Sequence, residues 1–449
     1  MTELRDARRV HVVGVGGAGM SAVARLLLER GAVVSGSDQH DAERLTQLRA
    51  LGANVVVGHD VAAAAAAELV LWSPAVRDDD PELAAARAGG ARLLARAELF
   101  GQLGDLAPVV GLCGTHGKTT STSMFVHVAR AARRDVGWLV GADVLGVGAN
   151  GHWGHEALIV EVDESYGTFA TVTPAALGVL NIEADHLDHY GSLAALEGAF
   201  AALARRTRGP VVGWVDDERV ARLAREIPAM TTVGTRSAQW LVRDVHLERR
   251  GATFSLVGPS EAIDLRLAVT GAHNVANAAV VAVLARAWGV EADAITTGLG
   301  AFRGAPRRFQ YRGRWGNADV YEDYAHLPGE IAATLRATRA VGYERPLVIF
   351  QPHRVSRTVA LAADFANCFD DATHVLVTDL YDAGEANPDH VTGEVIVRAA
   401  RDAHPDAPMT YVGALANVPD ALAPYGDVDV VLILGAGDVG SVLDHLVRP

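Results

Sequence analysis

Lysine is almost absent from this sequence. Lys118 is the only lysine in 449 residues, and arginine supplies every other cationic side chain besides histidine. An ammonium and a guanidinium differ in size, shape and flexibility, so the two are not interchangeable where a phosphate must fit closely. The single exception therefore indicates a position that needs a compact, flexible point charge.

Cysteine and long apolar runs are also scarce. The two cysteines, Cys113 and Cys368, lie far apart in the sequence, which excludes a disulfide framework and gives no metal-binding spacing. The apolar runs are alanine-rich or of strand length, well short of the roughly 20 residues that span a bilayer. The first residues lack a signal-peptide pattern. We therefore expect a cytoplasmic protein that does not enter the membrane.

Basic residues are also fewer than acidic ones: 40 lysines and arginines stand against 54 aspartates and glutamates, so the formal net charge is −14. This balance argues against broad electrostatic binding to nucleic acid. Small anionic substrates remain possible, because local arginines and helix ends can bind them. At 449 residues the chain exceeds what one hydrophobic core usually organises, so two or three domains are expected.

The sole lysine lies in a glycine-rich stretch that follows an apolar run and precedes a helical pattern. Gly114 and Gly117 allow backbone N–H groups to surround polyphosphate oxygens, Lys118 adds a charge, and Thr119 can ligate Mg²⁺. The strict G-x-x-x-x-G-K-[ST] spacing would need glycine where this chain has Leu112, so the loop is a variant. We predict a nucleoside triphosphate site, with the Lys118 ammonium largely solvated when no ligand is bound.

A dinucleotide-type fingerprint opens the chain. Gly14, Gly16 and Gly19 form G-x-G-x-x-G after an apolar run, and Asp38 ends the next one. This βαβ pattern predicts a diphosphate at the helix N-terminus and a ribose-like hydroxyl near Asp38. NAD, FAD and UDP-sugars satisfy it equally. A second G-x-G-x-x-G, residues 435–440, follows the last apolar run, and we interpret it as a structural turn.

Two further apolar runs end in polar side chains. Residues 157–165 end in acidic residues, and residues 177–190 end in acidic residues and histidines. Ligands gather at the C-terminal ends of strands in open α/β sheets, so Glu161 or Asp163 is placed to reach a metal held by a nucleotide. Mg²⁺ prefers oxygen ligands. Zinc is an alternative for the second cluster, although the usual zinc spacings do not accompany it.

The remaining pattern completes an α/β fold. Asn274 and Asn277 lie on one face of an alanine-rich helix, where their amides either read a base edge or, for Asn274, cap the helix. After a break at residues 304–309, four apolar runs alternate with helical patterns. We predict three domains: a Rossmann-like N-terminal domain, a central α/β domain of the P-loop ATPase type, and a Rossmann-like C-terminal domain.

These motifs together closely resemble the Mur ligases of peptidoglycan synthesis, over nearly the whole chain. The blocks that carry the resemblance are Gly14–Ser21, Gly36–Asp38, Gly58–His59, Gly114–Thr120, Glu161–Ser165, Asn181–His186, His273–Asn274 with Asn277, Arg307–Phe309, Asp323–His326, Gln351–Arg354 with Arg357, and Ala383–Glu385. The resemblance implies a UDP-sugar domain (1–105), an ATP/Mg²⁺ domain (106–306) and an amino-acid-binding domain (307–449).

The resemblance also implies roles for individual residues. The expected catalytic residues are Lys118, Glu161, His186, His326 and His353. The expected ATP-binding residues are Gly114, Thr115, His116, Gly117, Lys118, Thr119, Thr120, Asn274, Asn277, Arg308 and Asp323. The expected substrate-binding residues are Gly16, Gly17, Gly19, Met20, Ser37, Asp38, His59, Ser73, Tyr324, Arg354 and Arg357. The expected metal ligands are Thr119, Glu161 and His186.

The implied activity is the ATP-dependent joining of L-alanine to the muramoyl carboxylate of UDP-N-acetylmuramate through an acyl phosphate, by a monomer or homodimer. Leu327 replaces a histidine that the family usually has, which leaves another amino acid or a peptide open. The histidines and arginines of the third domain could instead form interdomain ion pairs. An NAD-dependent dehydrogenase and a non-catalytic nucleotide-binding relative are two competing hypotheses. The dehydrogenase leaves Lys118 unexplained, and the inactive relative would be expected to have lost it.

Overall fold

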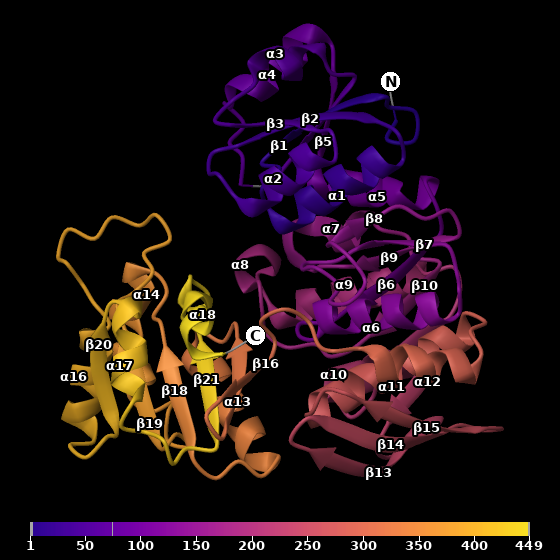
Figure 1. Cartoon of the computed structure of the whole chain (residues 1–449). Coiled ribbons are helices and arrows are strands. Elements are labelled where there is room, and N and C mark those ends of the chain that lie inside the picture. Colours follow the sequence, from indigo (N-terminus) through magenta and orange to yellow (C-terminus); the bar gives the residue numbers. More distant parts are fainter. Residues whose placement is uncertain (1–2, 74, 448–449) are drawn as a thin grey trace. The chain divides into compact units, whose positions relative to one another are not determined.

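The computed structural model describes residues 3–73 and 75–447 and contains three sheets, each flanked by helices (Figure 1). The predicted α/β fold with three domains is confirmed. Most strands are parallel and buried on both faces, as in β21, where all five residues of Val-Val-Leu-Ile-Leu are buried. Such continuous apolar runs are typical of parallel sheets covered by helices.

The first sheet is parallel and has the strand order β3-β2-β1-β4-β5. Its strands are β1 (Arg9–Val13), β2 (Val33–Asp38), β3 (Asn54–Val57), β4 (Leu69–Trp72) and β5 (Arg92–Ala95). Its helices are α1 (Ala18–Glu29), α2 (Glu43–Ala50), α3 (Val61–Ala66), α4 (Pro81–Gly89) and α5 (Arg96–Gln102). The strand order reverses between β1 and β4, and ligands of such sheets bind outside the strand ends at this point.

The middle sheet has ten strands in the order β15-β14-β13-β12-β11-β10-β6-β9-β7-β8. They are β6 (Val109–Cys113), β7 (Val136–Leu139), β8 (Gly151–His152), β9 (Ala157–Glu161), β10 (Ala176–Val179), β11 (Val211–Trp214), β12 (Thr231–Gly234), β13 (Trp240–Glu248), β14 (Gly251–Val257) and β15 (Ala262–Leu267). The helices are α6 (Lys118–Ala131), α7 (Thr168–Thr171), α8 (Leu187–Tyr190), α9 (Leu193–Arg206), α10 (Glu218–Glu226), α11 (Ala272–Ala287) and α12 (Ala292–Ala301). Strand β6 lies between β9 and β10, so the polar ends of all three strands meet.

The third sheet has the order β16-β17-β21-β18-β19-β20, in which β16 pairs antiparallel with β17 and the following strands pair in parallel. Its strands are β16 (Gln310–Trp315), β17 (Ala318–Asp323), β18 (Pro346–Phe350), β19 (His374–Thr378), β20 (Met409–Gly413) and β21 (Val430–Leu434). Its helices are α13 (Pro328–Ala340), α14 (Val355–Ala360), α15 (Ala362–Phe365), α16 (Glu394–Ala403), α17 (Val418–Leu422) and α18 (Leu443–Leu446).

The chain forms two compact units. One contains residues 1–246 and 252–305, and the other contains residues 247–251 and 306–449. The first two sheets thus belong to one unit, and the Asn150 amide joins them by donating to the Ala18 carbonyl oxygen at 2.7 Å. Phe100 and Phe169 belong to one hydrophobic cluster that extends across both domains. The boundary after residue 105 therefore stays a prediction.

No helix in the described part of the chain is both long and apolar enough to cross a membrane.

Candidate active site

The glycine-rich loop connects β6 to α6 as predicted. Gly117 is the residue before the helix and has a φ of 83°, a left-handed conformation that favours glycine. A Cβ there would lie 2.7 Å from Asn277 Oδ1. His116 N donates to Asn181 Oδ1 at 2.7 Å, and Thr115 Oγ1 accepts from Glu183 N at 2.8 Å. The end of β10 thus fixes the loop, whose helix N-terminus suits phosphate.

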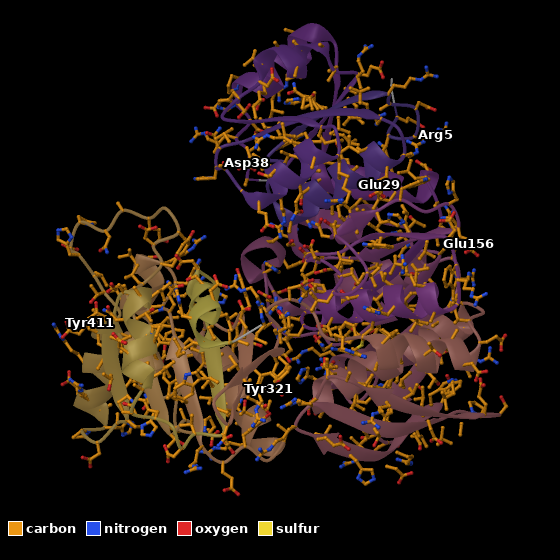
Figure 2. The ribbon with its side chains drawn as sticks, in the orientation of Figure 1. Arg5, Glu29, Asp38, Glu156, Tyr321 and Tyr411 are labelled. Atoms are coloured by element: carbon orange, nitrogen blue, oxygen red, sulfur yellow. The ribbon has the colours of Figure 1, made fainter. Side chains whose placement is uncertain are left out.

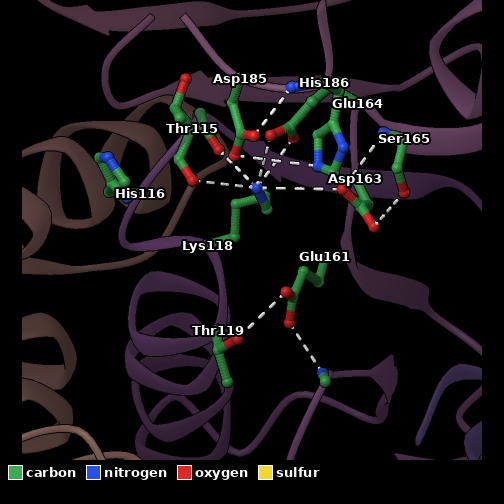
Figure 3. A network of polar contacts seen from close by, with 12 residues as sticks. Thr115, His116, Lys118, Thr119, Glu161, Asp163, Glu164, Ser165, Asp185 and His186 are labelled. Carbon is green, nitrogen blue, oxygen red and sulfur yellow. Dashed lines mark hydrogen bonds and ion pairs between the residues drawn. The ribbon is translucent and has the colours of Figure 1, made fainter. Parts of the chain in front are cut away.

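Lys118 is held inside this loop. Its Nζ donates to Glu164 Oε2 at 2.8 Å, to Gly114 O at 2.9 Å and to Thr115 O at 3.2 Å (Figure 3). The Lys118 side chain is only 14% exposed. The expectation of a largely solvated ammonium is therefore wrong, because a buried carboxylate 46 residues along the chain pairs with it.

The two oxygen ligands expected for Mg²⁺ lie side by side. Thr119 Oγ1 donates to Glu161 Oε1 at 3.0 Å, and Gly141 N donates to Glu161 Oε2 at 2.7 Å. Burial raises the pKa of Glu161, although hydrogen bonds from Gly141 and Thr119 and the charge of Lys118 oppose this shift. Each of these hydrogen bonds uses a different carboxylate oxygen, which leaves a lone pair on each. A hydroxyl and a carboxylate in contact are oxygen donors of the type that Mg²⁺ prefers, so this pair fits the ion.

His186, the third expected ligand, belongs to a different group. Its ring lies with Asp163 and Glu164, with ligand atoms within 4.8 Å of one another. In Figure 3 these side chains lie on one side of Lys118, whereas Glu161 and Thr119 lie on the other. The Lys118 charge lowers the pKa of Asp163 against the effect of burial. The structure thus divides the predicted metal set into two groups.

A cavity of about 280 Å³ lies beside the loop. It is lined by Asn277, His273, Asn181, Trp214 and Asp217, among others. Burial lowers the pKa of His273. The Asn274 amide, in contrast, donates to the Thr270 carbonyl oxygen at 2.7 Å, which satisfies a backbone group next to the helix start. Of the two asparagines, Asn277 alone lines this cavity. Thr120 lies in the first turn of α6 and is half-buried.

The first domain has a larger cavity of about 630 Å³ outside the ends of β1, β2 and β4. Its lining includes Gly14, Gly17, Ser37, Asp38, Gly58, His59 and Ser73. Gly16 N donates to Asp38 Oδ2 at 2.8 Å, and His40 N donates to Asp38 Oδ1 at 3.1 Å. Asp38, labelled in Figure 2, therefore fixes the glycine loop as well as facing the cavity.

Buried Glu82 organises the wall of this cavity. Its side chain accepts hydrogen bonds from Ser37 Oγ at 2.6 Å, His59 Nδ1 at 3.2 Å, Asp60 N at 2.6 Å and His11 Nε2 at 3.1 Å. Burial raises the pKa of Glu82, but these hydrogen bonds outweigh it and bring the value to about 2. Ser37 and His59 are thus held through one carboxylate.

A third cavity, of about 340 Å³, lies between the first and middle domains. It is lined by Gly17, Gly19, Met20, Ser73, Arg96, Glu161 and Asp163, among others. The N-terminus of α1 and the end of β9 therefore border one space. The glycine fingerprint and the expected metal ligand come together here.

In the third domain, two expected histidines lie together, with ring centroids 5.8 Å apart. His326 Nδ1 is 3.0 Å from the Tyr324 carbonyl oxygen, so Nδ1 carries the hydrogen and Nε2 of the neutral ring can accept. Arg357 Nη1 donates to His353 Nδ1 at 3.3 Å. Burial, with nearby positive groups, lowers the pKa of His353 to about 4, and burial also lowers that of His326.

The other expected residues of this domain are partly engaged. Arg354 has a φ of 73° and lies 3.7 Å from Glu385. Arg308 lies over the Tyr324 ring at 5.3 Å. Asp323 accepts from Phe309 N at 2.6 Å, and burial raises its pKa. Leu327 directly precedes α13, makes no side-chain capping hydrogen bond, and donates its backbone N–H to Glu330 Oε2 at 3.1 Å.

The second glycine motif is structural, as interpreted from the sequence. Gln351 donates to Asp438 Oδ1 at 2.7 Å and accepts from Val439 N at 3.0 Å. A Cβ at Gly437 would lie 2.4 Å from Gln351 Oε1. The Gln351 side chain, at the end of β18, therefore fills the space beside this turn.

Four contributing residues were missed by sequence reasoning: Glu82, Arg96, Glu164 and Trp214. Each acts across a long sequence separation, and only the Glu-x-Asp-Glu stretch gave any signal. His273 was noted in a motif but given no role.

Three family models match this chain in order. They are described as "Mur ligase family, catalytic domain" over residues 9–107, "Mur ligase middle domain" over 112–285, and "Mur ligase, glutamate ligase domain" over 307–437. Together they cover most of the three sheets.

Curated relatives match over almost the full length. The UDP-N-acetylmuramate–L-alanine ligase of Renibacterium salmoninarum is 38% identical over 100% of this chain and 98% of its own. That of Thermobifida fusca is 38% identical, over 99% and 97% respectively.

Solved structures agree. A UDP-N-acetylmuramate–alanine ligase from Thermotoga maritima has a TM-score of 0.82 and 31% identity, covering 98% of both chains. A murein peptide ligase from Psychrobacter arcticus, at 22% identity and a TM-score of 0.67 over 97% of both chains, shares the fold. From the matched domains and the full-length relatives, it follows that this chain belongs to the Mur ligase family.

Proposed function

We propose that this chain is an ATP-dependent ligase that joins L-alanine to the lactyl carboxylate of UDP-N-acetylmuramate, a cytoplasmic step in peptidoglycan precursor synthesis. The observation that carries the proposal is the cavity between the first two domains, which is bordered by both the N-terminus of α1 and Glu161. It gives a sugar nucleotide of the first domain direct access to the phosphate-transfer site of the second. The identity of the sugar nucleotide and the amino acid rests on the relatives.

A carboxylate is a poor acyl donor, so the reaction begins with transfer of the γ-phosphoryl group of ATP to it. The loop N–H groups, the N-terminus of α6 and Lys118 stabilise the charge on the phosphoryl oxygens. ATP oxygens compete with Glu164 for the Lys118 ammonium, which lies 2.8 Å from that carboxylate. Thr119 and Glu161 would hold Mg²⁺, which supplies further positive charge to the transferred group.

The acyl phosphate then reacts with the neutral amine of L-alanine, and phosphate leaves from the tetrahedral intermediate. His326 is neutral near pH 7 because burial lowers its pKa, and its Nε2 can accept the proton of the amine. Neutral His353 and cationic Arg357 can donate to the amino acid's carboxylate. His186, Asp163 and Glu164 are proposed to form a second group of residues that bind a metal ion or transfer a proton.

The adenine of ATP is assigned to the 280 Å³ cavity, with Asn277 and His273 as its polar contacts. The uridine is assigned to the 630 Å³ cavity around Asp38 and His59. In this cavity Asp38 accepts two backbone N–H groups, so its side chain is already oriented.

The test is phosphate release with ATP, Mg²⁺ and UDP-N-acetylmuramate against a panel of amino acids. We expect release to require both the sugar nucleotide and an amino acid, with L-alanine the best. Equal stimulation by glycine, L-serine and bulky amino acids would contradict the assigned amino acid, on which Leu327 bears directly. Full-rate release with ATP alone would contradict ligation.

A further inference from the structure

Arg96 is a largely buried cation with one unsatisfied hydrogen-bond donor, its Nε. It is the first residue of α5, and its side chain is 18% exposed. Its Nη2 lies 3.8 Å from Asp163 Oδ2, beyond hydrogen-bond distance, and its Cζ lies 5.4 Å from the Phe100 ring. Its Nε is buried and has no hydrogen-bond partner within residues 3–73 and 75–447. A buried guanidinium N–H without an acceptor is unfavourable, so this side chain is suited to an anionic ligand.

The cavity that Arg96 lines adjoins the cavity assigned to the nucleoside. The 340 Å³ and 630 Å³ cavities share Gly17, Ser73 and Ala75. Gly17 directly precedes α1, so a diphosphate bound by the helix N-terminus lies at this shared boundary. A sugar nucleotide whose base occupies the larger cavity therefore extends its far end toward Arg96.

The charges that line the smaller cavity indicate which chemical group of a sugar nucleotide can bind there. Arg96 is the only lysine or arginine among the described residues that line the smaller cavity, where Glu161 and Asp163 are the acids. A ligand carboxylate that approached Glu161 without a cation beside it would be repelled. An uncharged sugar would not require the arginine.

We propose that Arg96 binds the lactyl carboxylate of the muramoyl group and so distinguishes UDP-N-acetylmuramate from UDP-sugars that lack a carboxylate. The inference rests on the proposed function and assigns it a specificity residue. The planar guanidinium can bind a carboxylate with two parallel N–H groups, and the unpaired Nε supplies one of them. Asp163 is a weak competitor, since its Oδ2 already accepts from Ser165 Oγ at 2.7 Å.

The experiment measures, by calorimetry, the binding of UDP-N-acetylmuramate and UDP-N-acetylglucosamine to the wild-type full chain and to Arg96→Gln. Charge-assisted hydrogen bonds of this kind correspond to about 10- to 100-fold in affinity. We expect Arg96→Gln to lose that factor for UDP-N-acetylmuramate and to bind UDP-N-acetylglucosamine within about twofold of wild type. Arg96→Lys keeps the charge without the fork and should fall between the two.

Arg87→Gln, at an exposed position of α4 in the same domain, is the matched control and should bind both nucleotides like wild type. If Arg96→Gln fails to fold, the comparison is made with Arg96→Lys, whose loss must still be confined to the ligand with a carboxylate. Equal losses for both ligands would place Arg96 at the diphosphate and overturn the inference, as would no loss for either. A wild-type chain that binds neither nucleotide would overturn the proposed function itself.

Discussion

Two glutamates, fully buried Glu82 in the first domain and half-buried Glu161 in the second, have pKa values that are shifted in opposite directions. Glu82 accepts four hydrogen bonds, from Ser37, His59, Asp60 and His11, and these bring its pKa to about 2 despite burial. Glu161 accepts two, and burial raises its pKa. Glu82 thus accepts twice as many hydrogen bonds as Glu161, and the pKa of Glu82 is lowered where that of Glu161 is raised.

The number of hydrogen bonds that each carboxylate accepts indicates a structural role for Glu82 and a ligand-binding role for Glu161. Every lone-pair direction of Glu82 is occupied by the protein, so its carboxylate orients Ser37 and His59 and has no capacity for a ligand. The Glu161 carboxylate keeps free lone pairs next to Thr119 Oγ1, as a cation-binding group must. The His59, Asp80 and Glu82 grouping resembles a metal site by distance, but the occupied lone pairs of Glu82 argue against one.

The largest effect is expected at Lys118, beside the Glu161 site. Lys118→Arg should lower turnover about 10²- to 10³-fold, because a planar fork cannot reproduce the contacts of the ammonium inside a glycine loop. Steady-state phosphate release measures this. MgATP should also protect Lys118 from an amine-directed reagent, which can otherwise modify only this side chain and the N-terminus. An arginine variant with more than about a tenth of wild-type turnover would contradict a direct phosphate contact.

Lys118 also affects stability, because its side chain is largely buried and paired. Its ammonium compensates buried Glu164, and removing one partner of a buried pair costs about 3 kcal/mol. Lys118→Ala should therefore destabilise the first unit, and Lys118→Arg less so. Urea unfolding distinguishes this loss from the kinetic one.

Glu82→Gln should destabilise the first domain by about 3 kcal/mol, the free energy that corresponds to its lowered pKa. Because the folded pKa lies below the unfolded one, this stabilisation is present above pH 4.5 and is lost as the pH falls toward 2. Urea unfolding at pH 7 measures it, with the exposed Glu43→Gln as control. A Glu82→Gln variant as stable as the control would remove the basis of the comparison.

Glu161→Gln should show the reverse pattern. Turnover should fall about 10²-fold through the loss of the proposed Mg²⁺ ligand, whereas stability should stay equal or rise, because burial already disfavours the charged form. Melting temperature and phosphate release on the same preparation give both values. A strongly destabilised Glu161→Gln variant would mean that Glu161 is structural, like Glu82.

The smallest effect extends the comparison to the third domain. Burial and nearby charges lower the pKa of His353 to about 4, so between pH 6.5 and 4 the unfolded chain binds a proton that the folded chain does not. Stability therefore falls as the pH decreases through this range. His353→Asn should lose about 1 kcal/mol less than wild type between pH 7 and 5, after allowance for partial exposure. Parallel urea titrations at both pH values measure the difference, and identical pH slopes would contradict the lowered pKa.

The parts predicted correctly are those encoded in short stretches. The α/β fold, the loop at Gly117 and the acidic end of β9 follow from spacing and strand-to-helix alternation. The pairing of Lys118 with Glu164 depends instead on β6 and β9 being neighbours, which local sequence does not encode. For the same reason the burial of the lysine was predicted wrongly.

Distances between strand ends are equally hidden from the sequence. The sequence predicts that His186 is a metal ligand together with Glu161. In the structure, however, His186 lies next to Asp163 and Glu164. From the sequence Arg96 is an ordinary helix-start residue, because its acidic neighbour Asp163 lies 67 residues away in the second domain. These positions depend on tertiary packing, as does the network of Glu82.

Oxygen transfer tests the central claim, attack of the muramoyl carboxylate on ATP, most directly. UDP-N-acetylmuramate labelled with ¹⁸O in its carboxylate is incubated with the chain, ATP, Mg²⁺ and L-alanine, and the released phosphate is analysed by ³¹P NMR. If an acyl phosphate forms, the carboxylate oxygen that bonds to phosphorus leaves with it, so each phosphate should carry one ¹⁸O. Unlabelled phosphate, released as the amide product accumulates, would contradict the account.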